Sequence, residues 1–97
     1  MPIRLDLNNP AFQHDWFSLP KDERVAVLNC LRKLASMDWL AIYNDHGLKW
    51  ESIQSRTGKA GRLYSIRITQ KMRAVVTRSD NVLEILTLHP HHDSAYR

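Results

Sequence analysis

The last third of the sequence constrains the fold most, because it contains successive stretches in which hydrophobic and polar residues alternate. Residues 64–69, 72–78 and 82–88 each follow this pattern. A period of two residues is typical of a strand that buries one face. The connections between these stretches, residues 69–72 and 80–81, are short enough for hairpin turns. We therefore expect three consecutive antiparallel strands.

Alternation also predicts which side chains share a face of each strand. Arg67 is expected opposite the hydrophobic face of the first stretch, and Arg73 opposite the hydrophobic face of the second. In the third stretch, the face opposite Glu84 is expected to hold Leu83, Ile85 and Thr87. The two arginines therefore lie on adjacent strands, where they can act together.

The first half of the chain contains one strand signal and two helix signals. Residues 1–7 alternate and predict a strand. Asn9 is a favoured helix N-cap and Pro10 suits the first helical position, so a helix is expected through Phe17. After the Ser-Leu-Pro break at residues 18–20, hydrophobic residues recur at three- and four-residue steps and predict a longer helix. Two helices joined so closely are expected to form a hairpin on one face of the sheet.

The middle of the chain shows weaker patterns. Periodicity fades over residues 38–47, which end in a turn cluster. The hydrophobic residues expected to continue the core under that loop are Trp39, Leu40, Ile42 and Tyr43. Residues 48–53 predict a strand in which Lys49 and Glu51 share a face. Residues 54–62 hold two glycines and three cations, and are expected to form a mobile basic loop.

The expected order is β-α-α-β-β-β-β, which is a small α+β domain with a helical hairpin packed on a mainly antiparallel sheet. A chain of 97 residues suffices for one domain, so residues 1–97 are expected to form a single unit. The single cysteine, Cys30, excludes an intramolecular disulfide and is expected to be a small core residue. Neither a signal peptide nor an apolar run long enough for a bilayer occurs, which favours a cytoplasmic protein.

Basic residues are concentrated in the second half of the chain. The formal net charge is +4, the isoelectric point is near 9.6, and the acid Glu51 is alone among the basic residues between positions 49 and 78. Cationic surface attracts phosphate and releases condensed counterions, so an anion-binding surface is one interpretation. A solvated strand face with cations protecting an edge is the other. The basic residues concerned are Lys49, Arg56, Lys59, Arg62, Arg67, Lys71, Arg73 and Arg78.

A cluster of ionisable side chains ends the chain. Its members are His89, His91, His92, Asp93, Tyr96 and Arg97. Three explanations remain open: a metal site, a disordered polar terminus, and a catalytic cluster for phosphodiester chemistry. The metal site is the least favoured, because two of the histidines are adjacent and no recognised ligand spacing occurs.

The groups that RNA cleavage requires are all present. Attack by the 2′-hydroxyl needs a base, cations for the charge that develops on phosphorus, and an acid for the leaving 5′-oxygen. Histidine suits either proton-transfer role. Arg67 and Arg73 offer guanidinium groups that match phosphate. Glu51 is a candidate base or a partner for an arginine, and Tyr96 is a candidate for base stacking or proton donation.

At these residues the chain resembles the RelE/ParE superfamily of toxins from bacterial type II toxin–antitoxin modules. The segments that carry the resemblance are Leu-Pro-Lys-Asp-Glu-Arg, Leu-Arg-Lys-Leu-Ala, Leu-Tyr-Ser-Ile-Arg-Ile, Met-Arg-Ala-Val-Val and the final His-His-Asp-Ser-Ala-Tyr. The resemblance spans nearly the whole chain and implies a helical hairpin against a twisted antiparallel sheet. Members similar to RelE and YoeB cut messenger RNA in the ribosomal A site without a metal and leave a 2′,3′-cyclic phosphate. Members similar to ParE inhibit DNA gyrase.

The resemblance also implies roles for individual residues. It assigns phosphate stabilisation to Arg67 and Arg73, and C-terminal catalytic roles to His92 and Tyr96, while Glu51 takes the place of a glutamate used by YoeB-like members. The dense lysine cluster of RelE itself is missing, so the base is expected to be Glu51 or a histidine. The residues expected to bind RNA are Lys49, Arg56, Lys59, Arg62, Lys71 and His89.

The expected function is therefore a ribosome-dependent, metal-independent mRNA endoribonuclease toxin whose catalytic tail covers residues 89–97. The implied partners are a cognate antitoxin, messenger RNA and the ribosome, with no cofactor and no membrane. The alternative is a ParE-like protein that inhibits gyrase by binding without cleavage. A third possibility is a relic that binds an antitoxin and has lost its activity.

Overall fold

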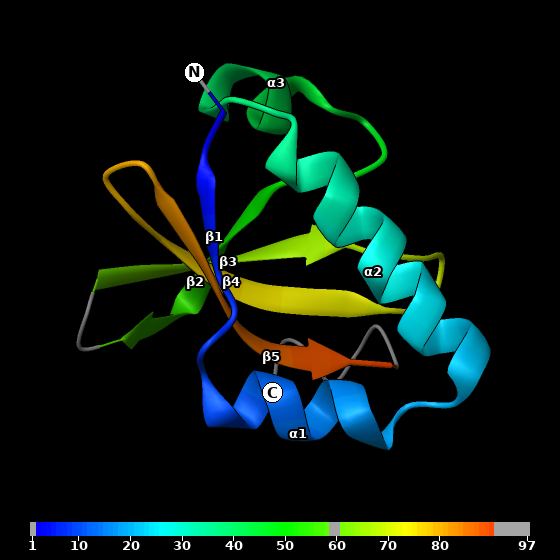
Figure 1. Ribbon diagram of the computed structural model, residues 1–97. Helices are drawn as coiled ribbons and strands as arrows, with labels where there is room; N and C mark the ends of the chain where they lie inside the picture. Colours follow the sequence, from blue (N-terminus) through cyan, green and yellow to red (C-terminus); the bar gives the residue numbers. More distant parts are fainter. Residues whose placement is uncertain (1, 59–60, 91–97) are drawn as a thin grey trace.

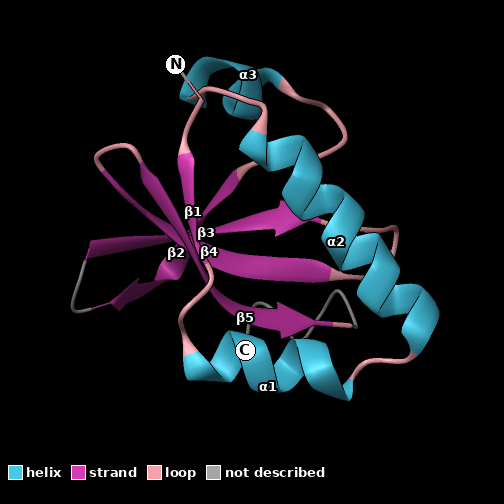
Figure 2. Cartoon of the chain, in the orientation of Figure 1, coloured by secondary structure: helices cyan, strands magenta, loops and turns pink. Residues whose placement is uncertain are grey.

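A five-stranded mixed sheet forms the centre of the fold, with the two longer helices packed on one of its faces (Figures 1 and 2). The structure is a computed structural model that describes residues 2–58 and 61–90 of the 97-residue chain. In chain order the elements are β1 (Arg4–Asp6), α1 (Pro10–Ser18), α2 (Lys21–Ala35), α3 (Trp39–Asn44), β2 (Glu51–Gly58), β3 (Gly61–Arg67), β4 (Arg73–Ser79) and β5 (Val82–His89). The strand order is β1-β5-β4-β3-β2, with β1 parallel to β5 and the other pairs antiparallel. The predicted α+β class is confirmed.

The helical hairpin begins where the sequence predicts it. The side chain of Asn9 accepts a hydrogen bond from the backbone N–H of Ala11 at 2.8 Å, and Pro10 is the first helical residue. At the joint between α1 and α2, the indole N–H of Trp16 donates to the carbonyl oxygen of Arg24 at 3.1 Å. This bond fixes the two helices to one another.

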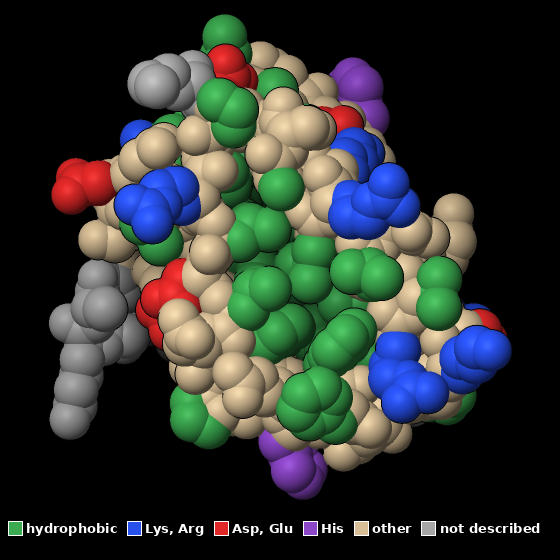
Figure 3. Space-filling view, viewed as in Figure 1, with side chains coloured by type: hydrophobic (Ala, Val, Ile, Leu, Met, Phe, Trp, Pro, Cys, Tyr) green, Lys and Arg blue, Asp and Glu red, His purple; other side chains and the backbone are tan. Residues whose placement is uncertain are grey.

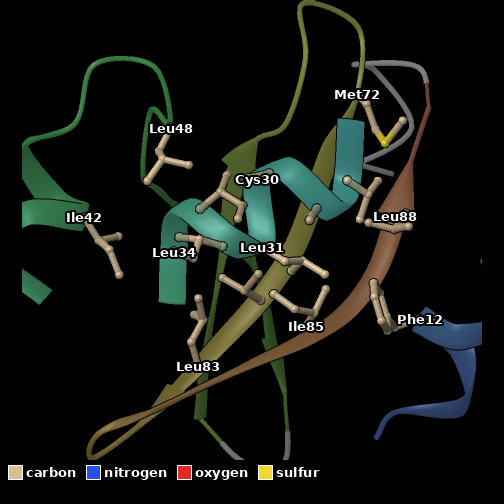
Figure 4. Packing of buried hydrophobic residues seen from close by; sticks show 14 of the residues in the cluster. Phe12, Cys30, Leu31, Leu34, Ile42, Leu48, Met72, Leu83, Ile85 and Leu88 are labelled. Atoms are coloured by element: carbon tan, nitrogen blue, oxygen red, sulfur yellow. The ribbon is translucent and has the colours of Figure 1, made fainter. Parts of the chain in front are cut away.

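One cluster of buried hydrophobic residues fills the space between the helices and the sheet (Figure 4). α1 contributes Phe12 and α2 contributes Leu34, and both pack against strand residues such as Ile85. Cys30 is buried in this cluster, as expected, and its burial raises the pKa of the thiol to about 11. The helices cover only one face, and the side chains of Arg67, Arg73 and His89 lie on the other.

Turn residues set the pairing of the central strands as predicted. The hydroxyl of Thr69 accepts a hydrogen bond from the backbone N–H of Met72 at 3.0 Å, which closes the turn between β3 and β4. Asp80, in the turn before β5, has a φ of 53°, a left-handed conformation that Asp tolerates. β1 is shorter than the predicted strand over residues 1–7, and β2 begins later than residue 48. No helix among the described residues is long and apolar enough to cross a lipid bilayer.

A third helix replaces the loop predicted over residues 38–47. α3 follows Asp38, whose carboxylate accepts a hydrogen bond from the backbone N–H of Ala41 at 2.9 Å. Six residues are too few to establish a helical period, so hydrophobic patterning misses this element. Ile42 is buried as expected, whereas Leu40 is 70% exposed, which contradicts its assignment to the core.

The prediction of a loop over residues 54–62 is also wrong for residues 54–58 and 61–62, the part of this stretch that the structure describes. β2 and β3 extend into this region, with Thr57 paired to Arg62 and Gly58 paired to Gly61. Backbone hydrogen bonds hold such a two-stranded ribbon, and they require no hydrophobic side chain. The prediction fails because hydrophobic periodicity cannot detect a pairing of this kind.

A β-bulge in β5 changes the face of the residues that follow it. Leu86 is the extra residue, because the ladder shifts between the partners of Val75 and Val76. One extra residue reverses the alternation of side chains. Thr87 therefore lies on the face opposite Ile85, and the prediction that they share a face is wrong.

Candidate functional site

The face of the sheet opposite the helices carries a row of basic side chains. Arg67 in β3 pairs directly with Arg73 in β4, and Arg73 pairs directly with His89 in β5. Directly opposite residues have Cβ atoms about 4.5–5.5 Å apart, so these three side chains are immediate neighbours. The bulge at Leu86 is what gives His89 this place.

Such a row is unfavourable unless negative charge accompanies it. Like charges directly opposite each other destabilise an antiparallel sheet. The described chain provides one carboxylate here, that of Glu51 in β2, whose strand partner is Ser65. Within the described residues, no hydrogen bond or ion pair engages the guanidinium of Arg67, which is half-buried. Arg67 can therefore accept an anion.

Arg73 forms hydrogen bonds to several other residues of this site. It is 1% exposed. Its Nη2 donates to the Ser65 hydroxyl at 3.0 Å, to the Lys49 carbonyl oxygen at 3.3 Å and to Glu51 Oε1 at 3.4 Å. Burial of a cation is tolerated when hydrogen bonds and an opposite charge compensate it. These contacts fix the position of Glu51 relative to β4.

Glu51 and Lys49 form the exposed side of the site. The Nζ of Lys49 lies 3.7 Å from Glu51 Oε1, so the prediction that these residues share a face is confirmed. The Glu51 side chain is 40% exposed, and one of its oxygens is within reach of both cations. Glu51 thus combines access to solvent with a fixed orientation, which a general base needs.

Lys49 has an unusual backbone conformation. Its φ is 50°, in the left-handed region that L-residues rarely adopt. This conformation accompanies the hydrogen bond from Arg73 to the Lys49 carbonyl oxygen. Backbone strain of this kind occurs often at functional sites.

The structure separates the other predicted RNA-binding residues. Lys71 is exposed in the turn next to the Arg67–Arg73 end of the sheet, whereas Arg62 pairs with Thr57 in the ribbon away from the row. Arg56 lies in β2. Lys59 lies outside the described residues, and so do the predicted catalytic residues His92 and Tyr96. Their predicted roles stay predictions.

Arg78 does not lie with the other basic residues of positions 49–78, with which the sequence groups it. Its guanidinium carbon lies 4.3 Å from the centroid of the Trp39 ring and 5.8 Å from that of Tyr43, and it donates a hydrogen bond to the Tyr43 hydroxyl. Trp39 packs against the core on the helix side. Arg78 therefore binds aromatic rings on the face opposite the candidate site.

Sequence reasoning does not single out two polar residues of the site. Ser65 is buried and accepts the hydrogen bond from Arg73, and the Thr87 hydroxyl lies 2.9 Å from His89 Nε2. For Ser65, the only signal in the sequence is that this hydroxyl residue shares a face with Arg67 on an alternating strand. No sequence signal exists for Thr87, because its face depends on the bulge.

A second surface feature lies between α1 and α2. Hydrophobic side chains gather on this face of the molecule, with Lys and Arg side chains beside them (Figure 3). A groove of about 320 Å³ is lined by Trp16, Phe17, Lys21, Arg24, Val25 and Leu28. Phe17 is 64% exposed, and Val25 and Leu28 are also exposed. Hydrophobic exposure of this kind with a basic border is typical of an interaction surface.

Comparison with known proteins supports the fold. No family model matches the chain, and no curated protein matches it in sequence. Among solved structures, the chain is similar to a toxin from Helicobacter pylori, solved as a copper-bound point mutant. The two chains are 20% identical with a TM-score of 0.54, and the match covers 95% of this chain and 97% of that chain. The protein therefore shares the fold of that toxin along nearly its whole length.

Proposed function

We propose that the protein is the toxin of a type II toxin–antitoxin system and acts as a ribosome-dependent mRNA endoribonuclease without a metal. The observation that carries the proposal is the row of Arg67, Arg73 and His89 with Glu51 attached to it. This arrangement combines an anion site with a fixed carboxylate, which are two requirements of RNA cleavage. The shared fold with the Helicobacter pylori toxin supports the toxin part of this proposal.

In the proposed reaction the 2′-oxygen attacks the adjacent phosphorus, and the bond from phosphorus to the 5′-oxygen breaks. The products are a 2′,3′-cyclic phosphate and a 5′-hydroxyl. Glu51 takes the proton of the 2′-hydroxyl, and His92 is the alternative base. The proton for the 5′-oxygen comes from His92 or Tyr96. These roles for His92 and Tyr96 rest on the resemblance.

The two arginines have different roles in this proposal. Arg67, whose guanidinium has no described partner, contacts the phosphate as it gains charge. Arg73 is too buried for an extended contact with substrate, so it holds Glu51 and adds positive charge beneath the phosphate. Lys49, Lys71 and His89 surround this position and attract the RNA backbone.

Induced expression in bacteria tests the proposal. The wild-type protein should stop growth, with incorporation of labelled methionine falling before incorporation of labelled thymidine. Glu51→Gln and Arg67→Ala should each remove the inhibition, because base and phosphate contact are lost. Arg32→Ala, which removes an exposed cation on α2, is the matched control and should remain inhibitory. Loss of DNA synthesis first, together with lost gyrase supercoiling, would favour the ParE-like alternative.

We also propose that the cognate antitoxin docks in the groove between α1 and α2. The groove combines the hydrophobic residues Phe17, Val25 and Leu28 with the cations Lys21 and Arg24. An amphipathic segment with hydrophobic and acidic residues complements both features. The net charge of +4 attracts such a partner.

A substitution in the groove tests the docking. Leu28→Glu places a negative charge among the hydrophobic residues and should weaken antitoxin binding about a hundredfold or more. Leu40→Glu changes an equally hydrophobic and more exposed residue of α3 outside the groove and should leave affinity unchanged. Isothermal titration with the antitoxin encoded beside the toxin gives the two affinities. Equal affinities for both variants would contradict the proposed location.

A further inference from the structure

The turn that leads into β2 is held by a contact from α2, away from the candidate site. Lys33 Nζ lies 3.0 Å from both Oδ1 and Oδ2 of Asp45. Asp45 Oδ1 also accepts a hydrogen bond from the backbone N–H of Leu48 at 2.8 Å. The Asp45 carbonyl oxygen accepts another from the N–H of Lys49 at 3.2 Å. We refer to residues 45–49 as the Asp45 turn.

The Asp45 turn packs closely against the ion pair. A Cβ atom on Gly47 would lie 3.2 Å from Asp45 Oδ1 and 3.5 Å from Lys33 Nζ. The hydrogen bonds from Lys33 and from the Leu48 N–H hold the pKa of Asp45 below its usual value. The carboxylate is therefore charged, and it is engaged by a side chain and by the backbone at the same time.

The other end of the Asp45 turn contacts the candidate site. The carbonyl oxygen of Leu48 accepts a hydrogen bond from the backbone N–H of Arg67 at 2.6 Å. The next carbonyl, that of Lys49, accepts from Arg73 Nη2. The Lys49 carbonyl accepts this bond while the φ angle of Lys49 is 50°. Such a backbone conformation costs free energy, so contacts with neighbouring residues have to hold it.

We infer that Lys33 and Asp45 are positioning residues of the site. They hold the Asp45 turn, and the turn keeps Lys49 in its left-handed conformation. The Lys49 carbonyl oxygen then orients Arg73 together with Ser65 and Glu51. This assignment rests on the proposed function in so far as the site is catalytic. An ion pair as exposed as this one contributes little to stability by itself. Its removal should therefore disturb the geometry of Arg73 more than the stability of the fold.

Kinetics of ribosome-bound mRNA cleavage test the inference. Asp45→Ala and Lys33→Ala should lower kcat about tenfold or more with KM changed less than about twofold, because misplaced catalytic groups slow the chemical step. Lys33→Arg keeps the ion pair and should restore the rate. Asp6→Ala is the matched control, since the Asp6 carboxylate also accepts a hydrogen bond from a backbone N–H, that of Asn8 at 3.0 Å, and β1 is at the opposite edge of the sheet from β2. Unchanged kcat in Asp45→Ala, or an equal loss in Asp6→Ala, would overturn the inference.

The substitution Lys49→Gly tests whether Asp45 acts through the backbone conformation of Lys49. Glycine adopts positive φ without steric cost, so it needs less help from the Asp45 turn. The fold-loss in kcat caused by Asp45→Ala should be smaller in a Lys49→Gly background than in the wild-type background. Equal fold-losses in the two backgrounds would show that Asp45 does not act through this conformation.

A spectroscopic measurement separates this inference from the proposed function. The ¹⁵N resonances of the Arg73 side chain should shift in Asp45→Ala and stay unchanged in Asp6→Ala. If the wild-type protein cleaves no RNA, the proposed function fails, and these resonances still decide whether Asp45 positions Arg73. Arg73 resonances identical to wild type in Asp45→Ala would overturn the positioning role.

Discussion

Arg73 is the residue around which the polar face of the sheet is organised. Its Nη2 contacts Ser65, Glu51 and the Lys49 carbonyl oxygen, which belong to β3, β2 and the turn before β2. A buried cation held in this way cannot easily move toward a substrate. Arg67, its direct partner across β3 and β4, is the arginine available for contact.

The Asp45 carboxylate makes the stability of the folded protein depend on pH in the acid range. Its pKa is lowered in the folded state, first by the hydrogen bond from Lys33 and then by that from the Leu48 N–H. In the unfolded chain its pKa returns to about 3.9. The unfolded state therefore binds the proton more readily, and the stabilisation is complete above that pKa and lost as the pH falls through the folded value.

Urea unfolding of wild type and Asp45→Asn measures this effect. We expect the wild type to be more stable at about pH 7, with a difference that is constant down to about pH 5 and shrinks below about pH 4. A difference that grows as the pH falls would have the wrong sign for a lowered pKa.

Cys30 is predicted to be a poor nucleophile. With a pKa of about 11, only about one thiol in a thousand is ionised at about pH 8. Alkylation by iodoacetamide should therefore be about a hundredfold slower in the folded protein than in urea, where the pKa returns to about 8.5. Mass spectrometry of timed samples gives both rates. Similar rates in the two states would show that the thiol is neither buried nor protonated.

Residue-level prediction from sequence succeeds where the backbone is regular. The pairing of Arg67 with Arg73 follows from two alternating stretches and a short turn between them. The contact of Arg73 with the Lys49 carbonyl oxygen does not follow, because it depends on a left-handed residue that alternation cannot reveal. The ion pair between Lys33 and Asp45 joins a helix to a distant turn, so no local pattern indicates it.

At the scale of elements, the bulge in β5 decides what the polar face contains. Leu86 is the extra residue, and beyond it Thr87 and His89 face the side of Arg73 while Leu88 faces the core. Without the bulge, the strict alternation of the strand would place His89 on the helix side. The bulge thus gives one strand a hydrophobic face along its whole length and a polar end at the site.

Deletion of Leu86 should remove the bulge and leave the later residues on their present faces. Ile85 and Thr87 become consecutive residues after the deletion, so Leu88 stays in the core, His89 stays on the polar face, and the free energy of unfolding should fall by less than about 2 kcal/mol. Leu86→Ala keeps the bulge and should cost less than about 2 kcal/mol, because this side chain is only partly buried. Urea unfolding followed by circular dichroism compares them. A loss of about 3 kcal/mol or more in the deletion variant would mean that Leu86 is not the extra residue of the strand.

The elements that the sequence predicts are those with strong local signals. α1 has a capping Asn and a leading Pro, and α2 has regular hydrophobic spacing. α3 has one capping residue, Asp38, and too few turns for a period. The ribbon formed by the ends of β2 and β3 has no hydrophobic pattern, so its composition suggests a loop instead.

At the scale of the whole molecule, the two proposed working surfaces lie on different faces. The groove between α1 and α2 is on the helix side, and the row of Arg67, Arg73 and His89 is on the opposite side of the sheet. An antitoxin that docks in the groove must therefore extend around an edge of the sheet to cover the basic row. In our proposal, acidic residues of that antitoxin replace the RNA phosphates as partners of the cations.

Cleavage of a defined messenger RNA by purified protein, with and without programmed ribosomes and in the presence of EDTA, tests the central claim most directly. The wild type should cut only ribosome-bound RNA, retain activity in EDTA and leave 2′,3′-cyclic phosphate ends, while Arg67→Ala should be at least about a hundredfold slower. Arg32→Ala should match the wild type. Absence of cleavage under every condition by a protein that still stops growth, or full activity of Arg67→Ala, would contradict the account.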